Sequence, residues 1–189
     1  MKKFFGIFVV AIAFFAATAQ AQNGLPAITK PVFDKGDNIV SLTVGYGSGF
    51  GQRLVYERSV YTFLDGRASV GVGAAFNNAI RTYKYNGYYY TSKDFRDYFT
   101  LGVVGSFHYQ FIDKLDTYVQ IGLGGGAYIS KDTWSYYDGT KNVYKNTYGI
   151  FDWTTTVGAR WYFNDNFAVN AEFGWVASSY FMAGVTYKF

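Results

Sequence analysis

The sequence contains no cysteine and only one histidine. A chain without cysteine has no disulfide scaffold, no thiolate metal site and no lipidated N-terminal cysteine, and a single histidine argues against a histidine metal cluster. Charge is also scarce, because 16% of the residues are charged and the net charge of +4 is too small to indicate attraction to nucleic acid. We therefore expect no metal, no cofactor and no nucleic-acid partner.

Long apolar runs are absent after residue 21, which excludes a later transmembrane helix. Residues 1–21 begin with two lysines, continue with an apolar stretch over residues 4–17, and end with Ala19 and Ala21. This is the layout of a secretory signal peptide cut after Ala21, and the stretch is shorter than the ~20 residues that a membrane anchor needs. Residues 22–37 contain both prolines and are expected to be an irregular periplasmic segment.

Aromatic residues and glycine are abundant, at 22% of the chain and 22 residues respectively. From Asn38 onward, apolar and polar residues alternate with period two, which predicts β-strands rather than helices. One face of each strand is almost wholly apolar, and its only charge is Arg58. The apolar faces fall in residues 40–46, 54–60, 68–76, 99–111, 117–129, 151–163, 167–177 and 181–189.

Alternation alone also fits a soluble β-sandwich, in which the apolar face would point inward. Two further features favour a membrane barrel instead. Short connections alternate with long ones, except that residues 47–52 and 178–179 are also short, and aromatic residues cluster at both ends of the apolar faces, as in interfacial girdles. The expected girdle residues are Tyr109, Phe111, Trp161, Phe163, Phe167, Tyr187 and Phe189 at the periplasmic ends, and Tyr46, Phe76, Phe99, Phe151, Trp153, Trp175 and Phe181 at the others.

The last predicted strand ends in Phe189, after Tyr187 and Val185. With these features the chain resembles the small eight-stranded outer-membrane barrels of the OmpA-domain and OmpX kind. The resemblance implies that Phe189 and Tyr187 form a C-terminal assembly signal read by the outer-membrane assembly machinery. The sequence thus predicts an all-β, membrane-spanning, eight-stranded antiparallel up-and-down β-barrel over residues 38–189, located in the bacterial outer membrane.

The opposite face of each strand is polar or small and is expected to line the lumen. An eight-stranded barrel has an interior that side chains fill, so charges enclosed there must pair or hold water. We expect Arg160 to bind Glu172 or Glu57. The predicted lumen charge cluster consists of Glu57, Arg160, Glu172, His108 and Arg53, with Asp116, Asp152 and Lys188 also facing inward.

Enzymatic chemistry has weaker support. Ser106 and His108 share a strand face and could form a nucleophile and base, as in the outer-membrane lipid A deacylases that such a pair resembles. They point inward, away from lipid, and no acidic residue can be assigned to orient the histidine. Hydrolysis by Glu57 and Glu172 would need a substrate path through a filled lumen. The glycines at 122, 124 and 126 lie in a strand and lack the features of a phosphate-binding loop.

Two connections contain tyrosine-rich hairpins. Asn86-Gly87 and Asp138-Gly139 are strong turn signals between alternating residues. The central four strands should therefore project beyond the membrane as a sheet with an open edge, which resembles the OmpX arrangement. The hairpin residues expected to bind a partner, or alternatively only to stiffen the sheet, are Tyr83, Tyr85, Tyr88, Tyr89, Trp134, Tyr136 and Tyr137.

These patterns favour a non-enzymatic outer-membrane protein with a structural or surface-interaction role, in adhesion or envelope integrity. Its expected partners are outer-membrane lipid, lipopolysaccharide and an extracellular protein or glycan. Two alternatives stay open: a narrow porin-like channel for ions or small solutes, and an outer-membrane lipid hydrolase.

Overall fold

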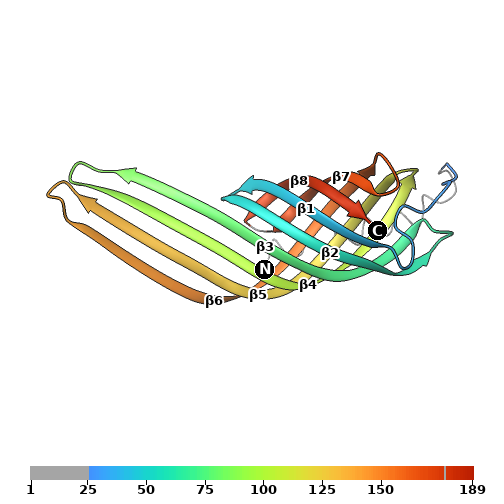
Figure 1. The fold of residues 1–189 in the computed structure, drawn as a ribbon, viewed down its shortest axis with the longest axis horizontal. Helices are drawn as coiled ribbons and strands as arrows, with labels where there is room; N and C mark the ends of the chain where they lie inside the picture. The colour runs from blue at the N-terminus through green and yellow to red at the C-terminus, as the bar shows by residue number, and fades with distance from the viewer. Residues whose placement is uncertain (1–25, 177) are drawn as a thin grey trace, which may run out of the picture.

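The computed structural model describes residues 26–176 and 178–189, so the signal peptide expected at residues 1–21 lies outside the described residues. Within those two ranges, no helix is long and apolar enough to cross a membrane. The chain forms eight antiparallel strands, each paired with its neighbour in sequence, and β1 pairs with β8 to close the ring (Figure 1). The strands are β1 (Asn38–Gly47), β2 (Phe50–Phe63), β3 (Ala68–Asn86), β4 (Tyr90–Ile112), β5 (Leu115–Tyr136), β6 (Lys141–Tyr162), β7 (Phe167–Val176) and β8 (Ser179–Lys188). The eight-stranded up-and-down barrel is thus confirmed.

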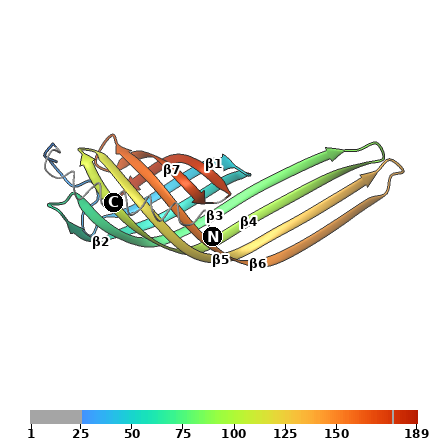
Figure 2. The same ribbon diagram turned by 180° about the vertical axis from the view of Figure 1, so that it is seen from behind.

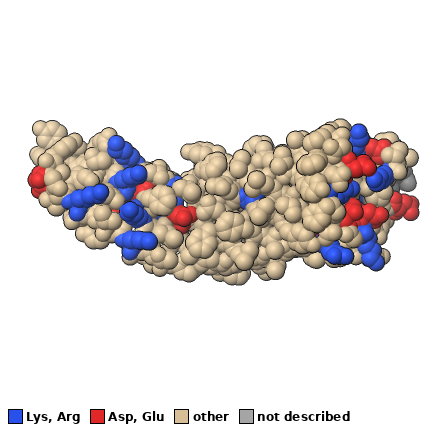
Figure 3. All heavy atoms as spheres, in the orientation of Figure 1, with Lys and Arg blue, Asp and Glu red and all other residues tan. Residues whose placement is uncertain are grey.

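The apolar side chains of the strands form the outer wall of the barrel. Leu101 and Val103 are 65% and 67% exposed, whereas Thr100 and Ser106 on the opposite face of β4 are buried. A soluble sandwich would place these faces the other way round. Charged side chains gather at the two ends of the visible surface and are scarce in the band between them (Figure 3).

Most expected girdle residues lie on this outer wall, but Tyr109 differs. It is fully buried, and its ring packs edge-on against Phe111 with 4.7 Å between the centroids. The alternation predicted the side of the sheet on which Tyr109 lies, but not that neighbouring groups cover it.

The two ends of the barrel are built differently. At one end, called here the turn end, short turns join β2 to β3, β4 to β5 and β6 to β7, and the C-terminus lies there (Figure 1). At the opposite, hairpin end, β1–β2 and β7–β8 are also joined by short loops. These two loops are linked, because Ser48 donates from its backbone N–H and its hydroxyl to the carbonyl of Ser178, at 2.9 and 3.0 Å.

Strands β3 to β6 continue beyond these loops as a four-stranded projecting sheet, which both views show (Figures 1 and 2). Pairing with β2 ends at Ile80 of β3, and pairing with β7 begins only at Thr155 of β6. The projecting sheet therefore has two open edges. Both expected turns are present: β3 ends at Asn86, and Gly139 adopts a φ of 88° between β5 and β6.

Closure of the β1–β8 seam requires glycine at inward positions on both strands, Gly45 of β1 and Gly184 of β8. Gly184 pairs with Thr43, and a Cβ atom added at Gly184 would lie 1.9 Å from the carbonyl oxygen of Leu42 and 2.7 Å from the Thr43 Cα. The obstructing atoms belong to the backbone of the partner strand, so they cannot rotate away. The seam therefore has no room for a side chain at this position.

We predict that Gly184→Ala destabilises the barrel by ~1–3 kcal/mol, the usual range for overpacking. The matched control is Gly105→Ala, because a Cβ there meets nothing within 4 Å. Urea unfolding in detergent and heat-modifiable migration on a denaturing gel measure both variants. Equal stability of the two variants would contradict this account of the seam.

Candidate functional site

The lumen of the barrel contains a network of buried charged side chains. Arg53 of β2 and Glu172 of β7 form an ion pair with 2.9 Å between Nη1 and Oε2. The hydroxyl of Tyr118 donates to the other oxygen of Glu172 at 2.7 Å, and Arg53 also donates to the side-chain oxygen of Gln120. Both oxygens of this buried carboxylate are thus satisfied, which offsets the cost of removing its charge from water.

Arg160 of β6 organises the second half of the network. Its guanidinium donates to Asp116 at 3.1 Å and to Glu57 at 3.3 Å, and it lies over the ring of Tyr118 at 3.9 Å from the centroid. Of the two carboxylates expected from the sequence, Arg160 therefore contacts Glu57. Glu172 is bound by Arg53 instead.

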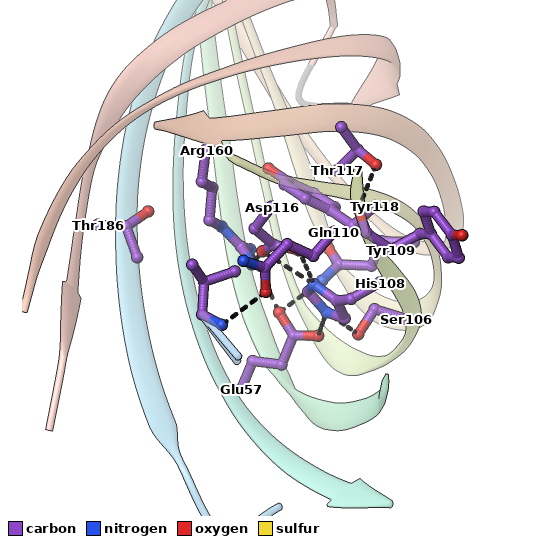
Figure 4. Close-up of polar contacts among 12 residues, drawn as sticks. Glu57, Ser106, His108, Tyr109, Gln110, Asp116, Thr117, Tyr118, Arg160 and Thr186 are labelled. Carbon is purple, nitrogen blue, oxygen red and sulfur yellow. Dashed lines mark hydrogen bonds and ion pairs between the residues drawn. The ribbon is translucent and has the colours of Figure 1, made fainter. Parts of the chain in front are cut away.

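His108 lies between two carboxylates (Figure 4). Its Nδ1 is 3.0 Å from each oxygen of Asp116, and its Nε2 is 2.8 Å from Glu57 and 3.0 Å from the hydroxyl of Ser106. The expectation that no acidic residue orients this histidine is wrong, because Asp116 occupies that position. The sequence could not show it, since the turn between β4 and β5 sets the register that places Asp116 beside His108.

This arrangement contains a serine, a histidine and an aspartate in hydrogen-bonding order, but Glu57 shares the Nε2 that would have to accept the serine proton. Two ionised carboxylates flanking one ring suit an imidazolium that donates from both nitrogens. Arg53, Arg160 and His108 would then balance Glu57, Glu172 and Asp116 within the lumen.

Two other inward charges lie apart from this network. Asp152 accepts a long hydrogen bond from Thr100 at 3.4 Å. Lys188 donates to the carbonyl of Val32 at 2.9 Å and is 3.6 Å from Asp37. Both Val32 and Asp37 belong to the segment that precedes β1.

That segment, residues 26–37, is called here the N-terminal strap and crosses the turn end of the barrel. Phe33 is buried, with its ring centroid 4.5 Å from that of His108. The Val32 backbone N–H donates to Gln110 at 2.9 Å, and Gln110 donates back to the Lys30 carbonyl at 3.1 Å. The sequence indicated only an irregular segment, because the strap has no alternation that would predict its docking.

The outer contacts of the strap are exposed. Lys30 and Asp165 form a surface ion pair at 3.1 Å, and the hydrogen bond and charge of Lys30 lower the pKa of the Asp165 carboxyl. Thr29 donates twice to Asp113, at 2.8 and 2.9 Å. Exposed pairs of this kind contribute little, so the buried Phe33 and Gln110 contacts dominate the attachment of the strap.

The predicted binding tyrosines divide into two groups on the projecting sheet. Tyr85, Trp134 and Tyr136 surround Tyr90, with ring centroids 6.0, 5.0 and 6.1 Å from it. Tyr83 lies beneath the Arg81 guanidinium at 4.1 Å from its centroid. The rings around Tyr90 thus pack across β3, β4 and β5, whereas Arg81 and Tyr83 lie on the same strand.

The remaining three tyrosines lie at the tips of the hairpins. Tyr88, Tyr89 and Tyr137 are 85%, 74% and 74% exposed. The backbone N–H of Tyr137 donates to the carbonyl of Tyr89 at 3.3 Å, which joins the two tips. The three rings therefore form one exposed group, called here the tip tyrosines.

Phe189 and Tyr187, the expected assembly signal, lie at the turn end of the seam. Phe189 and Asn38 exchange two backbone hydrogen bonds of 2.9 and 3.1 Å. Tyr187 and Phe189 stack with 5.9 Å between their centroids and remain on the outer wall. In residues 26–176 and 178–189, no group of three or more histidine and acidic side chains is arranged to hold a metal ion.

Comparison with protein-family models and with curated proteins found no match. Among solved structures, the chain is similar to Ail, the attachment invasion locus protein of Yersinia pestis, at 13% identity and a TM-score of 0.46, covering 82% of this chain and 99% of that one. The same protein in complex with the heparin analogue sucrose octasulfate is 15% identical, with a TM-score of 0.44 and the same coverage. The N-terminal β-barrel domain of Pseudomonas aeruginosa OprF is 13% identical, with a TM-score of 0.35, covering 82% of this chain and 98% of that one.

The class of the protein follows from its own strand pairing and surfaces. A closed antiparallel ring of eight strands, with an apolar outer wall and a polar interior, is an eight-stranded β-barrel of the outer-membrane type.

We predict that Arg53→Met lowers the free energy of unfolding by about 3–5 kcal/mol, because it leaves the buried Glu172 carboxylate without its counter-ion. Glu172→Met should cost a similar amount, because it leaves the buried Arg53 guanidinium without its counter-ion. The double variant Arg53→Met/Glu172→Met should recover part of the loss. Equilibrium urea unfolding in detergent measures this double-mutant cycle, and losses that add within ~0.5 kcal/mol would show that the pair is not coupled.

Proposed function

We propose that this protein is a non-enzymatic, integral barrel of the bacterial outer membrane with a surface-interaction role. The observation that carries the proposal is the group of tip tyrosines, held together at the far end of a projecting sheet. We place the hairpin end outside the cell and the turn end, with the strap, in the periplasm, because barrels of this type have short periplasmic turns.

Exposed tyrosines in water are suited to contact with a partner. Each ring provides apolar area and a hydroxyl at a low cost in side-chain entropy, which is why tyrosine is enriched in protein interfaces. Tyr88 and Tyr89 pack edge to face at 4.8 Å, so part of the surface is already ordered. The chemistry suits an extracellular protein or glycan.

A second surface supports contact with lipopolysaccharide. Lys84 lies directly opposite Lys93, and Lys131 lies directly opposite Lys145, all on the side of the sheet that continues the outer wall. Lys93 pairs with Thr133, two residues from Lys131, so the four lysines form a continuous band across the sheet. Like charges placed opposite each other are destabilising unless an anion lies between them.

The band has no internal counter-charge. Within residues 26–176 and 178–189, none of these four ammonium groups forms an ion pair with a carboxylate. The phosphate groups of an anionic outer leaflet would supply the missing charge. This supports a role in envelope integrity beside the contact made by the tip tyrosines.

We further propose that the lumen is closed. The ion pairs around Arg160 and Arg53 occupy its middle, and the N-terminal strap covers its periplasmic end with Phe33. Because these ion pairs and the docked Phe33 ring fill the lumen, an ion has no continuous water-filled path through it. Ser106 is buried against His108 in the same network, which supports a structural rather than a hydrolytic role for the pair.

The closed lumen predicts that the wild-type protein gives no steady conductance in a planar bilayer. Arg160→Ala should not reduce any current, because there is none to reduce. A steady current that Glu172→Gln or Arg160→Ala abolishes would contradict the closed lumen and favour the narrow channel.

For the surface role, replacing Tyr88, Tyr89 and Tyr137 together with serine should reduce binding of the barrel to host cells or extracellular matrix by about tenfold or more, as loss of interface aromatic residues does. Val143→Ser is the matched control, because Val143 is 50% exposed on the same projecting sheet but lies outside the tips. The folded fraction of each variant is checked by heat-modifiable migration. Unchanged binding by the triple variant, or by a chain shortened between residues 81 and 93, would remove the proposed contact.

A further inference from the structure

A cavity of about 390 Å³ opens at the base of the projecting sheet, away from both the tip tyrosines and the lumen network. One wall is the pair of short loops at Ser48, Gly49 and Ser178. The other wall is the sheet face that continues the lumen side, called here the inner face. The visible surface is hollowed where the sheet rises beyond β1 and β2 (Figure 3).

The floor of this cavity separates it from the lumen. Ala79 and Tyr98 line the cavity, and they pack on Val176 and Met182 in an apolar cluster. The cavity is therefore a pocket that ends on an apolar layer, and it is not the entrance of a channel. Its volume lies within the ~300–1,000 Å³ that small-molecule sites occupy.

Two arginines face this cavity from adjacent strands, since Arg81 and Arg96 are direct partners in the β3–β4 register. Arg96 is neutralised, because it donates to Asp132 and to Ser130 and lies 3.7 Å from Asp94. In the described part of the chain, Arg81 forms no ion pair. Its guanidinium is held over the Tyr83 ring, which leaves its N–H groups free to donate within the plane.

Three tyrosine rings complete the lining. Tyr83 is about half exposed, and Tyr98 and Tyr128 are partly buried beside it. A guanidinium binds a carboxylate or sulfate through two parallel hydrogen bonds. An aromatic ring offers a flat apolar surface on which the C–H face of a sugar ring can pack, and its hydroxyl can bond a sugar hydroxyl.

We propose that this cavity binds an acidic sugar, with Arg81 holding its anionic group and Tyr83, Tyr98 and Tyr128 contacting its ring. The proposal rests on the surface-interaction function above and assigns that function a second, small-molecule site. A neutral sugar would leave the Arg81 charge uncompensated, and a small inorganic anion would leave the rings uncovered.

The test uses the mature protein folded in detergent micelles and three disaccharides, measured by titration calorimetry. One carries a carboxylate, such as the hyaluronan disaccharide, one carries sulfate, and N-acetyllactosamine is neutral. We expect binding of at least one acidic disaccharide and none of the neutral one. Comparison of the carboxylate and sulfate disaccharides shows which anionic group the site binds.

Arg81→Gln should weaken acidic-disaccharide binding by roughly tenfold or more, the usual effect of losing a hydrogen bond to a charged group. Lys141→Gln is the matched control, because it removes one positive charge from β6 of the same projecting sheet, outside both the cavity and the lysine band. Tyr83→Ser should also weaken binding while leaving the net charge unchanged. Equal losses in Arg81→Gln and Lys141→Gln, or no binding of either acidic disaccharide, would overturn the proposal.

The two proposals fail separately. If the tip-tyrosine variant loses cell binding while acidic disaccharides do not bind the wild type, the surface role stands and the cavity site is refuted. If the disaccharide binds through Arg81 and the tip variant binds cells as the wild type does, the cavity site stands and the tip contact is refuted.

Discussion

The structure depends on one constraint: no backbone N–H or C=O group may remain unpaired where the surroundings are apolar. An unpaired group in hydrocarbon costs several kcal/mol, so a sheet with an apolar outer face cannot keep open edges there. The β1–β8 pairing removes those edges. Among the residues that the structure describes, open edges appear on β3 and β6 beyond the ends of their neighbours, in the projecting sheet, where water can satisfy the backbone.

Closure with eight strands then determines the interior. A ring this narrow cannot hold a wide water column, so polar side chains that face inward must satisfy one another. Each carboxylate of the network contacts at least one cationic group, and Tyr118 serves both halves, because its hydroxyl bonds Glu172 while its ring lies beneath Arg160. The N-terminal strap extends the same principle to the turn end, where Gln110 and Lys188 bond its backbone. On the projecting sheet, by contrast, Arg81 and the four lysines of the band form no ion pair with any residue in the described part of the chain.

Alternation predicted the fold, because a period of two assigns every side chain to one face without knowledge of its neighbours. It placed Glu57, Arg160 and Glu172 in the lumen, and the two Gly-containing turns marked the ends of the hairpins. It could not give the stagger of distant strands, and so did not show that Arg53 binds Glu172. It also could not give the register that the β4–β5 turn imposes, which places Asp116 beside His108. The docking of Phe33 was also beyond the sequence, since an irregular segment carries no periodic signal. The cavity at the base of the projecting sheet combines two loops with strands distant in sequence, and no local pattern marks such a site.

The central claim is that the first and last strands pair in the observed register to close the barrel. Because the natural chain has no cysteine, an engineered pair can report on the seam without interference. Leu42 and Val185 are direct partners on the outer wall, whereas Phe181 pairs with Tyr46, four residues along β1. Disulfides require Cα atoms within about 7 Å. We predict that Leu42→Cys/Val185→Cys cross-links when the folded protein is oxidised in detergent and that Leu42→Cys/Phe181→Cys does not. Equal cross-linking of the two variants, or no cross-link in the first, would contradict the observed β1–β8 register.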